Sequence, residues 1–167
     1  MPSAARRRPN GSLLADGFCP AAKLLAAGTN LALGTDGAAS NNDLDLFGEM
    51  RTAALLAKAV AQDARAVPAQ QALHMATLGG ARALDLQDET GSLAKGKSAD
   101  FIAVDLGALN TQPLYNVISQ LVYATAPQQV TDVFVAGRAL MRDRKLMTLD
   151  EESVSAKARE WRQRIQA

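Results

Sequence analysis

The sequence predicts an α/β chain, and three features of its pattern carry that prediction. A short apolar run at 31–33 is long enough for a buried strand, and glycines and a polar loop follow it at once. Apolar residues then recur at helical spacing between 46 and 61. From residue 90 the pattern changes to short segments rich in β-branched residues and separated by turns, which is typical of antiparallel strands.

The first element that we expect is a short helix over 20–27. Pro20 is well placed as its first residue, because the N–H that proline lacks would have no partner in the first turn of a helix. Gly28 is expected to end the helix. Cys19 precedes it, and with no histidine or second cysteine nearby we expect a structural thiol.

The stretch 30–49 carries the strongest indication of chemistry. Two glycines bracket Asp36 and its neighbour, so the backbone can turn sharply after the predicted strand. A carboxylate at the carboxyl end of a buried strand, ahead of a loop and a helix, is where (β/α)8 barrels keep catalytic residues. The same spacing is compatible with a plain Asp-Gly turn at Asp36 and with Asp45 as a helix N-cap, so it leaves both interpretations open.

Two helical segments are expected after this loop. The first, over 46–61, has one apolar face formed by Phe47, Met50, Ala54 and Ala57. The second begins at Pro68, is interrupted by the two glycines at 79–80, and resumes over 81–86. His74, the one histidine of the chain, lies on this second helix between apolar neighbours, so we expect exposure or packing rather than metal ligation.

The remainder is expected to be mostly β-structure. We predict a turn between short strands over 91–100, a buried strand over 101–104, a mixed loop and short helix over 113–123, and a hairpin that joins 130–135 to 138–141. Lys97 and Asp100 could be taken for site residues, but turn geometry and surface pairing explain them.

A terminal helix follows the hairpin. Thr148 to Glu151 has the pattern of a capping box, which predicts the start of that helix. Its apolar stripe is formed by Val154, Ala158, Trp161 and Ile165. The simplest interpretation of this stripe is a docking face.

Three stretches resemble a known family. Residues 33–45, Leu-Gly-Thr-Asp-Gly-Ala-Ala-Ser-Asn-Asn-Asp-Leu-Asp, resemble the last barrel strand and loop of the amidohydrolase superfamily. Within it they are most similar to deaminases of methylthioadenosine and S-adenosylhomocysteine, with triazine chlorohydrolases close by. Residues 72–84 and 91–100 match the same family, so the resemblance extends from about residue 14 to about residue 142.

The resemblance implies the fold class in more detail. It implies the C-terminal fragment of a metal-dependent (β/α)8 barrel hydrolase, with part of its small β-sandwich and a terminal helix. A whole barrel needs roughly 250 residues, so a chain of 167 residues cannot hold one. The expected parts are a disordered or non-homologous tail (1–13), the last barrel strand with flanking helices (14–89), a partial β-sandwich (90–147) and the C-terminal helix (148–167).

The resemblance also implies site residues. In that family the Asp of this motif is the final ligand of a catalytic zinc or iron and handles a proton from the metal-bound water, so both roles fall to Asp36. Ser40, Asn41 and Asn42 are implied to line the substrate mouth, although helix capping and loop hydrogen bonds explain them equally well. The family's His-x-His pair and its further histidines have no counterpart in this chain. We therefore expect the isolated chain to be inactive.

Composition limits the partners. Lys and Arg number 18 against 17 Asp and Glu, so no charge excess favours nucleic acid or a membrane surface. No apolar run approaches the ~20 residues of a membrane span, and a single cysteine indicates a reducing, cytoplasmic setting. Because a barrel fragment leaves apolar surface and strand edges uncovered, we expect the chain alone to form a homo-oligomer or to aggregate.

The predicted function follows from the resemblance. The chain is expected to be part of a hydrolase that acts on C–N bonds other than peptide bonds. It would deaminate an adenosine-like substrate, 5'-methylthioadenosine or S-adenosylhomocysteine, through metal-activated water. Two alternatives stay open: a non-catalytic binding or assembly module, and another amidohydrolase of the triazine chlorohydrolase or guanine/cytosine deaminase type.

Overall fold

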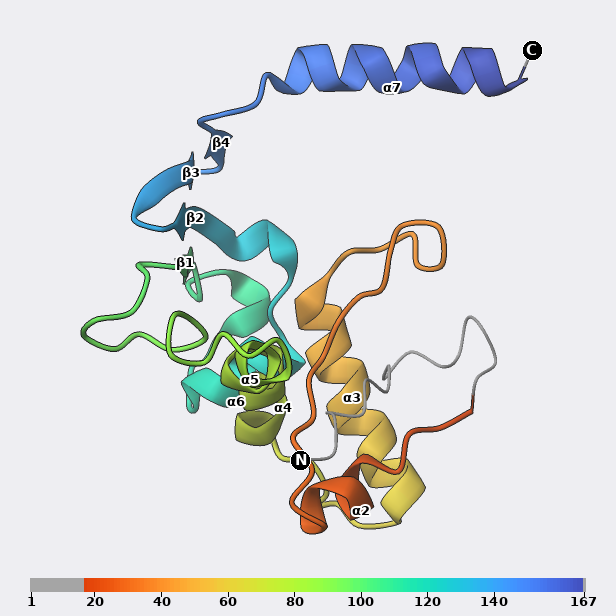
Figure 1. The fold of residues 1–167 in the computed structure, drawn as a ribbon, viewed down its shortest axis with the longest axis vertical. Coiled ribbons are helices and arrows are strands. Elements are labelled where there is room, and N and C mark those ends of the chain that lie inside the picture. The colour runs from red at the N-terminus through yellow and green to blue at the C-terminus, as the bar shows by residue number, and fades with distance from the viewer. Residues whose placement is uncertain (1–16, 167) are drawn as a thin grey trace.

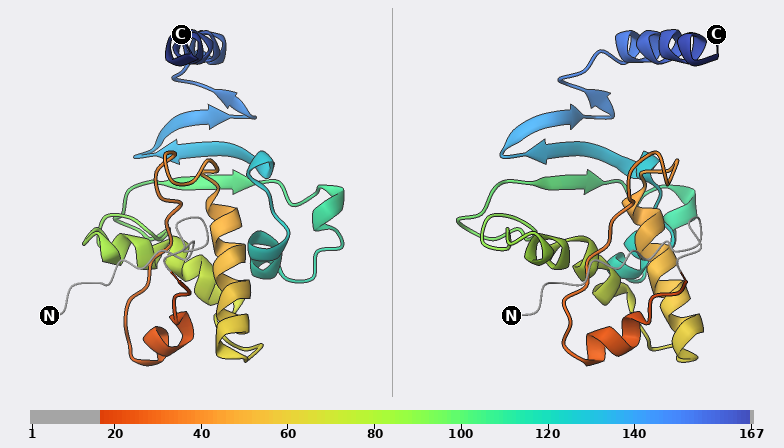
Figure 2. Two further views of the ribbon diagram at one scale, coloured as in Figure 1. Left: turned by 90° about the vertical axis from the view of Figure 1, so that its right-hand side faces the viewer. Right: turned by 45° about the vertical axis from the view of Figure 1, so that its right-hand side comes forward.

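The computed structural model describes residues 17–166, so the predicted tail over 1–13 lies outside the described residues. A layer of helices packs together, a small antiparallel sheet lies across one end of it, and a last helix projects beyond the sheet (Figures 1 and 2). The helices are α2 (Ala21–Ala26), α3 (Leu46–Ala61), α4 (Ala69–Ala76), α5 (Leu78–Ala83), α6 (Val117–Tyr123) and α7 (Glu151–Gln166). The strands are β1 (Phe101–Val104), β2 (Val130–Val135), β3 (Arg138–Arg142) and β4 (Lys145–Leu146).

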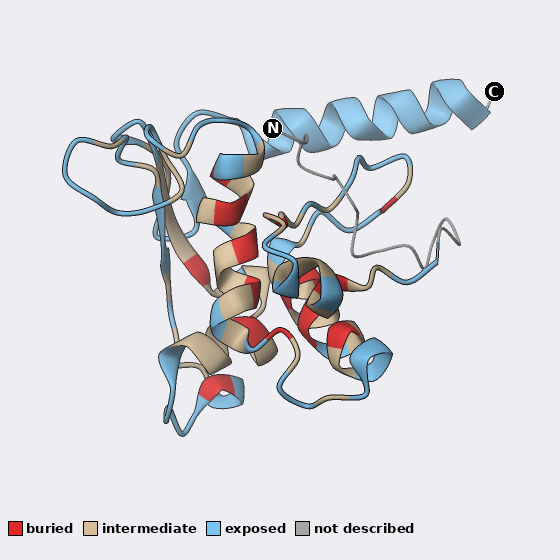
Figure 3. Ribbon diagram, turned by 60° about the horizontal axis from the view of Figure 1, so that its bottom comes forward, coloured by how far each residue is buried: buried red, intermediate tan, exposed pale blue. Residues whose placement is uncertain are grey.

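The hydrophobic core lies between α3, α4 and α6 (Figure 3). The predicted apolar face of α3 is confirmed at its centre, since Met50, Ala54 and Ala57 are buried. Four of the nine buried members of this core are alanine. Its members are Ala21, Leu31, Met50, Ala54, Ala57, Val67, Ala72, Met75 and Val122.

The predicted helix α3 has the bounds that the sequence indicated, and its cap explains why. The backbone N–H of Phe47 donates to the Asp45 carboxylate at 2.8 Å, which satisfies one of the amide groups left over at a helix start. The helices expected at 20–27 and from Pro68 are confirmed as α2 and α4, but Pro20 and Pro68 are their N-cap residues rather than their first helical residues.

The predicted strand over 31–33 is not a strand in this structure. The segment is extended, but no neighbouring strand lies beside it in the described part of the chain, and a strand needs a ladder partner. Its Leu33 N–H donates instead to the backbone oxygen of Met75 on α4, at 3.1 Å. Leu31 is nevertheless buried, so the apolar run does face the core.

The expected break at the two glycines 79–80 is also in a different place. The helix ends at Thr77, whose backbone angles of φ −121° and ψ −99° are not helical, and α5 then runs through both glycines. The Thr77 hydroxyl donates to the Leu73 oxygen at 2.7 Å. Gly79 is needed for packing, because a Cβ built there would lie 2.7 Å from the backbone oxygen of Leu31.

The sheet has the strand order β1-β2-β3-β4, with all neighbours antiparallel. The predicted hairpin is confirmed, and Ala136 and Gly137 at its turn both have positive φ. The predicted strand over 101–104 is confirmed as β1, but the expected burial is wrong, because Phe101 and Ile102 are 39% and 48% exposed. Phe101 and Ile102 are consecutive in the strand and point to opposite faces of the sheet. The described residues form one sheet, with no second sheet to cover either face.

The short strands expected around 91–100 are not formed, and turns occupy the segment. The Asp100 carboxylate accepts from the Ala136 N–H at 2.6 Å and from the Thr90 hydroxyl at 2.9 Å. The Lys97 ammonium donates to the backbone oxygens of Gln87 and Thr90. Both side chains therefore hold turns, as the sequence indicated.

Helix α7 is exposed over its whole length, and its predicted apolar stripe faces solvent. Its cap differs from the prediction: Asp150, not Thr148, accepts from the N–H groups of Glu152 and Ser153, at 3.0 and 3.3 Å. Among the described helices, none is both long and apolar enough to cross a membrane.

Candidate functional site

The candidate site is the loop that joins the extended segment 30–35 to α3, and it projects beyond the helical layer (Figure 1). Asp36 lies at the start of this loop with φ +63°, a left-handed conformation that Asp tolerates better than most residues. Its carboxylate is exposed, and its Oδ2 accepts from the Ser40 hydroxyl at 2.7 Å. Gly37 accepts through its backbone oxygen from the N–H groups of Ser40 and Asn41, both at 3.0 Å, which closes the turn.

Asn41 anchors the loop to α3. Its side chain is buried, at 9% exposed, and its Nδ2 donates to the Thr35 oxygen at 2.9 Å and to Glu49 Oε1 at 3.3 Å. Its Oδ1 accepts from the Asp43 N–H at 3.2 Å. The structure thus shows Asn41 in the loop-holding role that the sequence left open. A contact of Ser40 or Asn41 with substrate stays a prediction.

Glu49 is a site residue that the sequence analysis did not single out. It lies in the first turn of α3, where a carboxylate is favoured by the N-terminal end of the helix dipole, and it is only 4% exposed. The sequence does contain a signal for the burial of Glu49, because this acidic residue directly precedes Met50 and so falls at the edge of the predicted apolar face. Together, Asn41 and Glu49 tie the Asp36 turn to a helix of the core.

The described residues do not make up a metal site on their own. No group of three or more His, Cys, Asp and Glu side chains comes together within 17–166, whereas catalytic zinc takes three protein ligands. Asp36 provides one exposed carboxylate at the start of the loop. His74 is half-buried on α4, and Cys19 is half-buried beside the groove described next.

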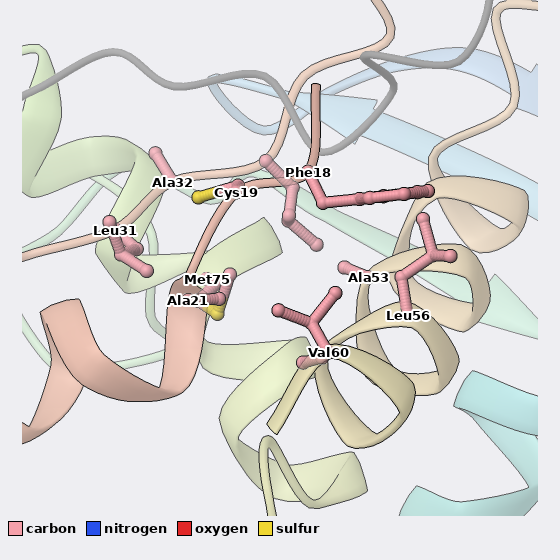
Figure 4. A pocket seen from close by; sticks show the side chains of 11 residues that line it. Phe18, Cys19, Ala21, Leu31, Ala32, Ala53, Leu56, Val60 and Met75 are labelled. Atoms are coloured by element: carbon pink, nitrogen blue, oxygen red, sulfur yellow. The ribbon is translucent and has the colours of Figure 1, made fainter. Parts of the chain in front are cut away.

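An apolar groove lies between the segment 31–33, α2 and α3 (Figure 4). Leu56 and Val60 of α3 form one wall, and Phe18 and Cys19 approach from the other side. Every residue that lines the groove is apolar or a cysteine. The full lining is Phe18, Cys19, Ala21, Leu31, Ala32, Leu33, Ala53, Leu56, Ala57, Val60 and Met75.

Comparisons with known proteins agree on the kind of molecule. A family model described as "Amidohydrolase family" matches residues 4–140. A 5-methylthioadenosine/S-adenosylhomocysteine deaminase of Teredinibacter turnerae is 50% identical over 154 residues, which is 92% of this chain and 35% of that protein. The chain therefore spans about a third of the length of the curated relative it matches.

Solved structures give the same picture. An adenosine deaminase from Xanthomonas campestris, crystallised with bound zinc, is 57% identical with a TM-score of 0.89 over 92% of this chain and 35% of that one. An atrazine chlorohydrolase from Arthrobacter aurescens, complexed with zinc, is 28% identical with a TM-score of 0.78 over 84% of this chain and 31% of that one.

Proposed function

Because this chain belongs to the amidohydrolase family, we propose that it is the C-terminal part of a metal-dependent hydrolase that deaminates an adenosine-like nucleoside. The substrates that we propose are 5'-methylthioadenosine and S-adenosylhomocysteine, since a relative with 50% identity carries that name. The observation that carries the proposal is an exposed carboxylate, Asp36, held on a left-handed turn by Ser40 and anchored through Asn41.

In this proposal Asp36 is one ligand of the metal and the proton-handling carboxylate, and the other ligands belong to the part of the relatives that this chain does not cover. Zinc or iron is the cofactor of the complete enzyme, where it would acidify a water molecule, since bound zinc lowers the pKa of water to about 7. The bound zinc in the Xanthomonas campestris structure supports this choice of metal.

The neighbours of Asp36 have distinct proposed roles. Ser40 donates to Oδ2 of Asp36, and this hydrogen bond helps to orient the carboxylate. Asn41 fixes the backbone oxygen of Thr35, the residue directly before Asp36, and so limits the movement of the carboxylate. We propose that the loop around Ser40 and Asn41 also forms one side of the substrate mouth.

A covalent chimera tests this function. The matched segment of the Xanthomonas campestris deaminase is replaced by this chain, and ammonia release is measured with zinc and 5'-methylthioadenosine, S-adenosylhomocysteine or adenosine. We expect zinc-dependent deamination and about one zinc per chimera, while the isolated chain retains none after desalting. In the chimera, Asp36→Asn should lower kcat/KM at least a hundredfold and reduce the retained zinc.

The control is Asp43→Asn, the same change at another exposed carboxylate of the loop. It should leave kcat/KM and the zinc content within twofold of the parent chimera. Full activity of Asp36→Asn, or a folded chimera that retains zinc but deaminates none of the three nucleosides, would contradict the proposal.

A second substrate class has support of its own. The structural match to an atrazine chlorohydrolase at 28% identity favours hydrolysis of a chlorinated triazine as the alternative reaction on the same site. Chloride release from atrazine by the chimera, without ammonia release from any nucleoside, would select this alternative.

A further inference from the structure

We propose that helix α7 is a dimerisation element, which pairs in antiparallel orientation with α7 of a second copy of this chain. The contact would be made by its apolar stripe, which is formed by Val154, Ala158, Trp161 and Ile165. None of these residues belongs to the loop that carries Asp36, so the dimer would form whether or not the proposed function is correct. The inference adds the surface, the partner and the orientation to the expectation that the chain forms a homo-oligomer.

The first observation is that α7 has no cover in the described part of the chain. Every residue over 151–166 is exposed, Trp161 to 60%. Figures 1 and 2 show the helix beyond the sheet, on the opposite side from the helical layer. A helix of this length is marginal in water by itself, because most helical stability comes from packing of an apolar face. A second helix laid along the stripe would supply that packing.

The second observation is the spacing of the stripe. Its members follow one another at steps of four, three and four residues, which is the a and d spacing of a coiled coil. The stripe is narrow, because the positions that flank it are polar or charged: Ser155, Lys157, Arg162 and Arg164. A seam of this width accommodates one partner helix rather than a broad apolar surface.

The third observation is the order of side-chain sizes along the seam. In an antiparallel pair, an a position of one helix faces a d position of the other, so Trp161 lies against Ala158 of the second copy. Val154 lies against Ile165 in the same way. Each layer then combines a larger with a smaller side chain, and such alternation fills a core without voids. A parallel pair would place Trp161 against Trp161 and Ala158 against Ala158, which leaves a crowded layer beside an underfilled one.

The fourth observation is the distribution of charge along α7. The first turn is acidic, with Glu151 and Glu152, and the second half is basic. Its cations are Arg159, Arg162 and Arg164, and its one acid, Glu160, is already paired with Arg164 at 2.6 Å. An antiparallel pair brings the acidic end of each helix beside the basic end of the other, and it also opposes the two helix dipoles. A parallel pair would bring like charges together.

The size of the contact sets the expected strength of the dimer. Sixteen residues make a helix about 24 Å long. A pair of such helices buries less area than the roughly 800 Å² per partner of a standard interface, so we expect a Kd in the micromolar range. A two-fold axis uses the same patch on both copies, which limits this contact to two chains.

The test uses Trp161, which is the one tryptophan of the chain, as a reporter of its own burial. The full chain is studied from about 1 to about 200 µM, a range that brackets the expected Kd, and sedimentation equilibrium measures the mass. We expect dimer formation to be accompanied by emission at shorter wavelength and by an at least twofold fall in quenching by acrylamide. Association through the apolar groove or through β1 would leave the emission of Trp161 unchanged, so the two kinds of contact are separated.

Two alanines of α7 provide a matched pair of variants. Ala158 lies in the stripe, and Ala156 lies on the opposite side of the helix, because two residues turn an α-helix by about 200°. Glutamate is a good helix former, so neither substitution breaks α7 by itself. Ala158→Glu should weaken the dimer at least tenfold and remove the change in Trp161 emission, whereas Ala156→Glu should change the Kd less than threefold.

Spin labels determine the orientation of the two helices. Cys19→Ser removes the native thiol, and Ser153→Cys then places one label on each copy. The antiparallel layers put the two labels roughly 20 Å apart along the helix axes, since a helix rises about 1.5 Å per residue. A parallel pair would put them about 10 Å apart, the distance between the axes of packed helices. We expect the longer distance, measured by double electron–electron resonance.

Three results would overturn the inference: Trp161 emission that does not change with concentration, equal weakening by the two glutamate variants, or the shorter label distance. The competing occupant of the stripe is another part of a longer enzyme, and the covalent chimera described above tests it. A monomeric chimera in which Trp161 is shielded, as judged by the difference from Trp161→Phe, would assign the stripe to that part and refute the dimer. A chimera that dimerises less when it carries Ala158→Glu would support it.

Discussion

Asp36 shows how a carboxylate proposed as a metal ligand is positioned by local hydrogen bonds rather than by burial. The side chain is exposed, and its place is defined by the left-handed backbone, by Ser40, and by the Asn41 anchor behind the turn. Because Asn41 is buried and its partners Thr35 and Glu49 would lose a donor, this side chain matters most for the shape of the loop.

We therefore predict that Asn41→Ala destabilises the loop. Leaving the Thr35 oxygen and Glu49 without this donor should cost about 1–3 kcal/mol of unfolding free energy. Urea unfolding and limited proteolysis within 35–45 measure the effect. Asn42→Ala is the control, since Asn42 is exposed and makes no hydrogen bond within the described residues, and it should differ from the parent by less than 0.5 kcal/mol. Equal loss in both variants would refute the anchoring role of Asn41.

Asp100 gives a prediction on pH. The Ala136 N–H, and after it the Thr90 hydroxyl, donate to its carboxylate and hold its pKa below the usual value of an Asp. A group whose pKa is lower in the folded state stabilises the fold above its unfolded pKa of about 3.9, and this contribution disappears as the pH falls through the folded pKa. The junction between β1 and the hairpin should therefore weaken below about pH 4.

The measurement is the urea midpoint between pH 6 and pH 2.5 for the parent and for Asp100→Asn. The variant keeps an oxygen acceptor but cannot be protonated in this range, so its midpoint should fall less steeply below pH 4. Asp88→Asn, at an exposed carboxylate with no hydrogen bond within the described residues, should follow the parent curve. Parallel curves for all three proteins would exclude Asp100 as a source of the acid sensitivity.

At the scale of elements, the contact between 31–33 and the α4–α5 junction depends on Gly79. A Cβ at this position would lie 2.7 Å from the Leu31 oxygen and 2.9 Å from the His74 oxygen, and both are main-chain atoms that cannot move independently. The next residue, Gly80, lies on the same helix with its nearest such contact at 3.8 Å.

We predict opposite effects on stability when each of these two glycines is replaced by alanine. Gly79→Ala should destabilise the protein by about 1–3 kcal/mol, because the backbone must shift to make room. Gly80→Ala should stabilise it by roughly 0.5–1 kcal/mol, because alanine loses less backbone entropy than glycine in a helix. Thermal or urea unfolding measures both, and a neutral Gly79→Ala variant would show that the segment 31–33 is not held against α5.

The elements also differ in how well local sequence predicts them. Helix α3 and the β2–β3 hairpin are determined by signals within a few residues: the Asp45 cap, apolar spacing, and a turn at Ala136-Gly137. The segment 31–33 has the composition of a strand but no partner in the described chain, so its state depends on residues elsewhere. The break at Thr77 was misplaced because a glycine pair inside α5 is used for close packing rather than for a turn.

The whole molecule has a small core and much exposed apolar surface. Half of the buried apolar side chains are alanine, while large ones remain exposed on several elements. These include Phe18 and Val60 at the groove, Leu55 elsewhere on α3, Phe101 and Ile102 on β1, and Trp161 and Ile165 on α7. Such extensive apolar exposure marks interaction surfaces or a tendency to associate.

We predict that the isolated chain self-associates. Gel filtration with light scattering at micromolar concentration should give species larger than one chain of 17.6 kDa, and a dye that binds apolar surface should fluoresce strongly. Adding a mild detergent, which covers exposed apolar surface, should reduce both signals. A monomer that melts cooperatively without binding the dye would contradict this prediction.

The sequence by itself determined the family, the bounds of α3, the hairpin and Asp36 as the candidate ligand, because caps, periodicity and motif residues act over short distances. Only the tertiary structure decided that Asn41 and Glu49 anchor the Asp36 turn, that 31–33 is an extended segment held against α4 rather than a strand, and that β1 is exposed. The physical reason is that a side chain's burial and a strand's existence both depend on partners distant in sequence. Within the described residues, 31–33 has no partner strand. β1 pairs with β2, but no second sheet in that part of the chain covers it.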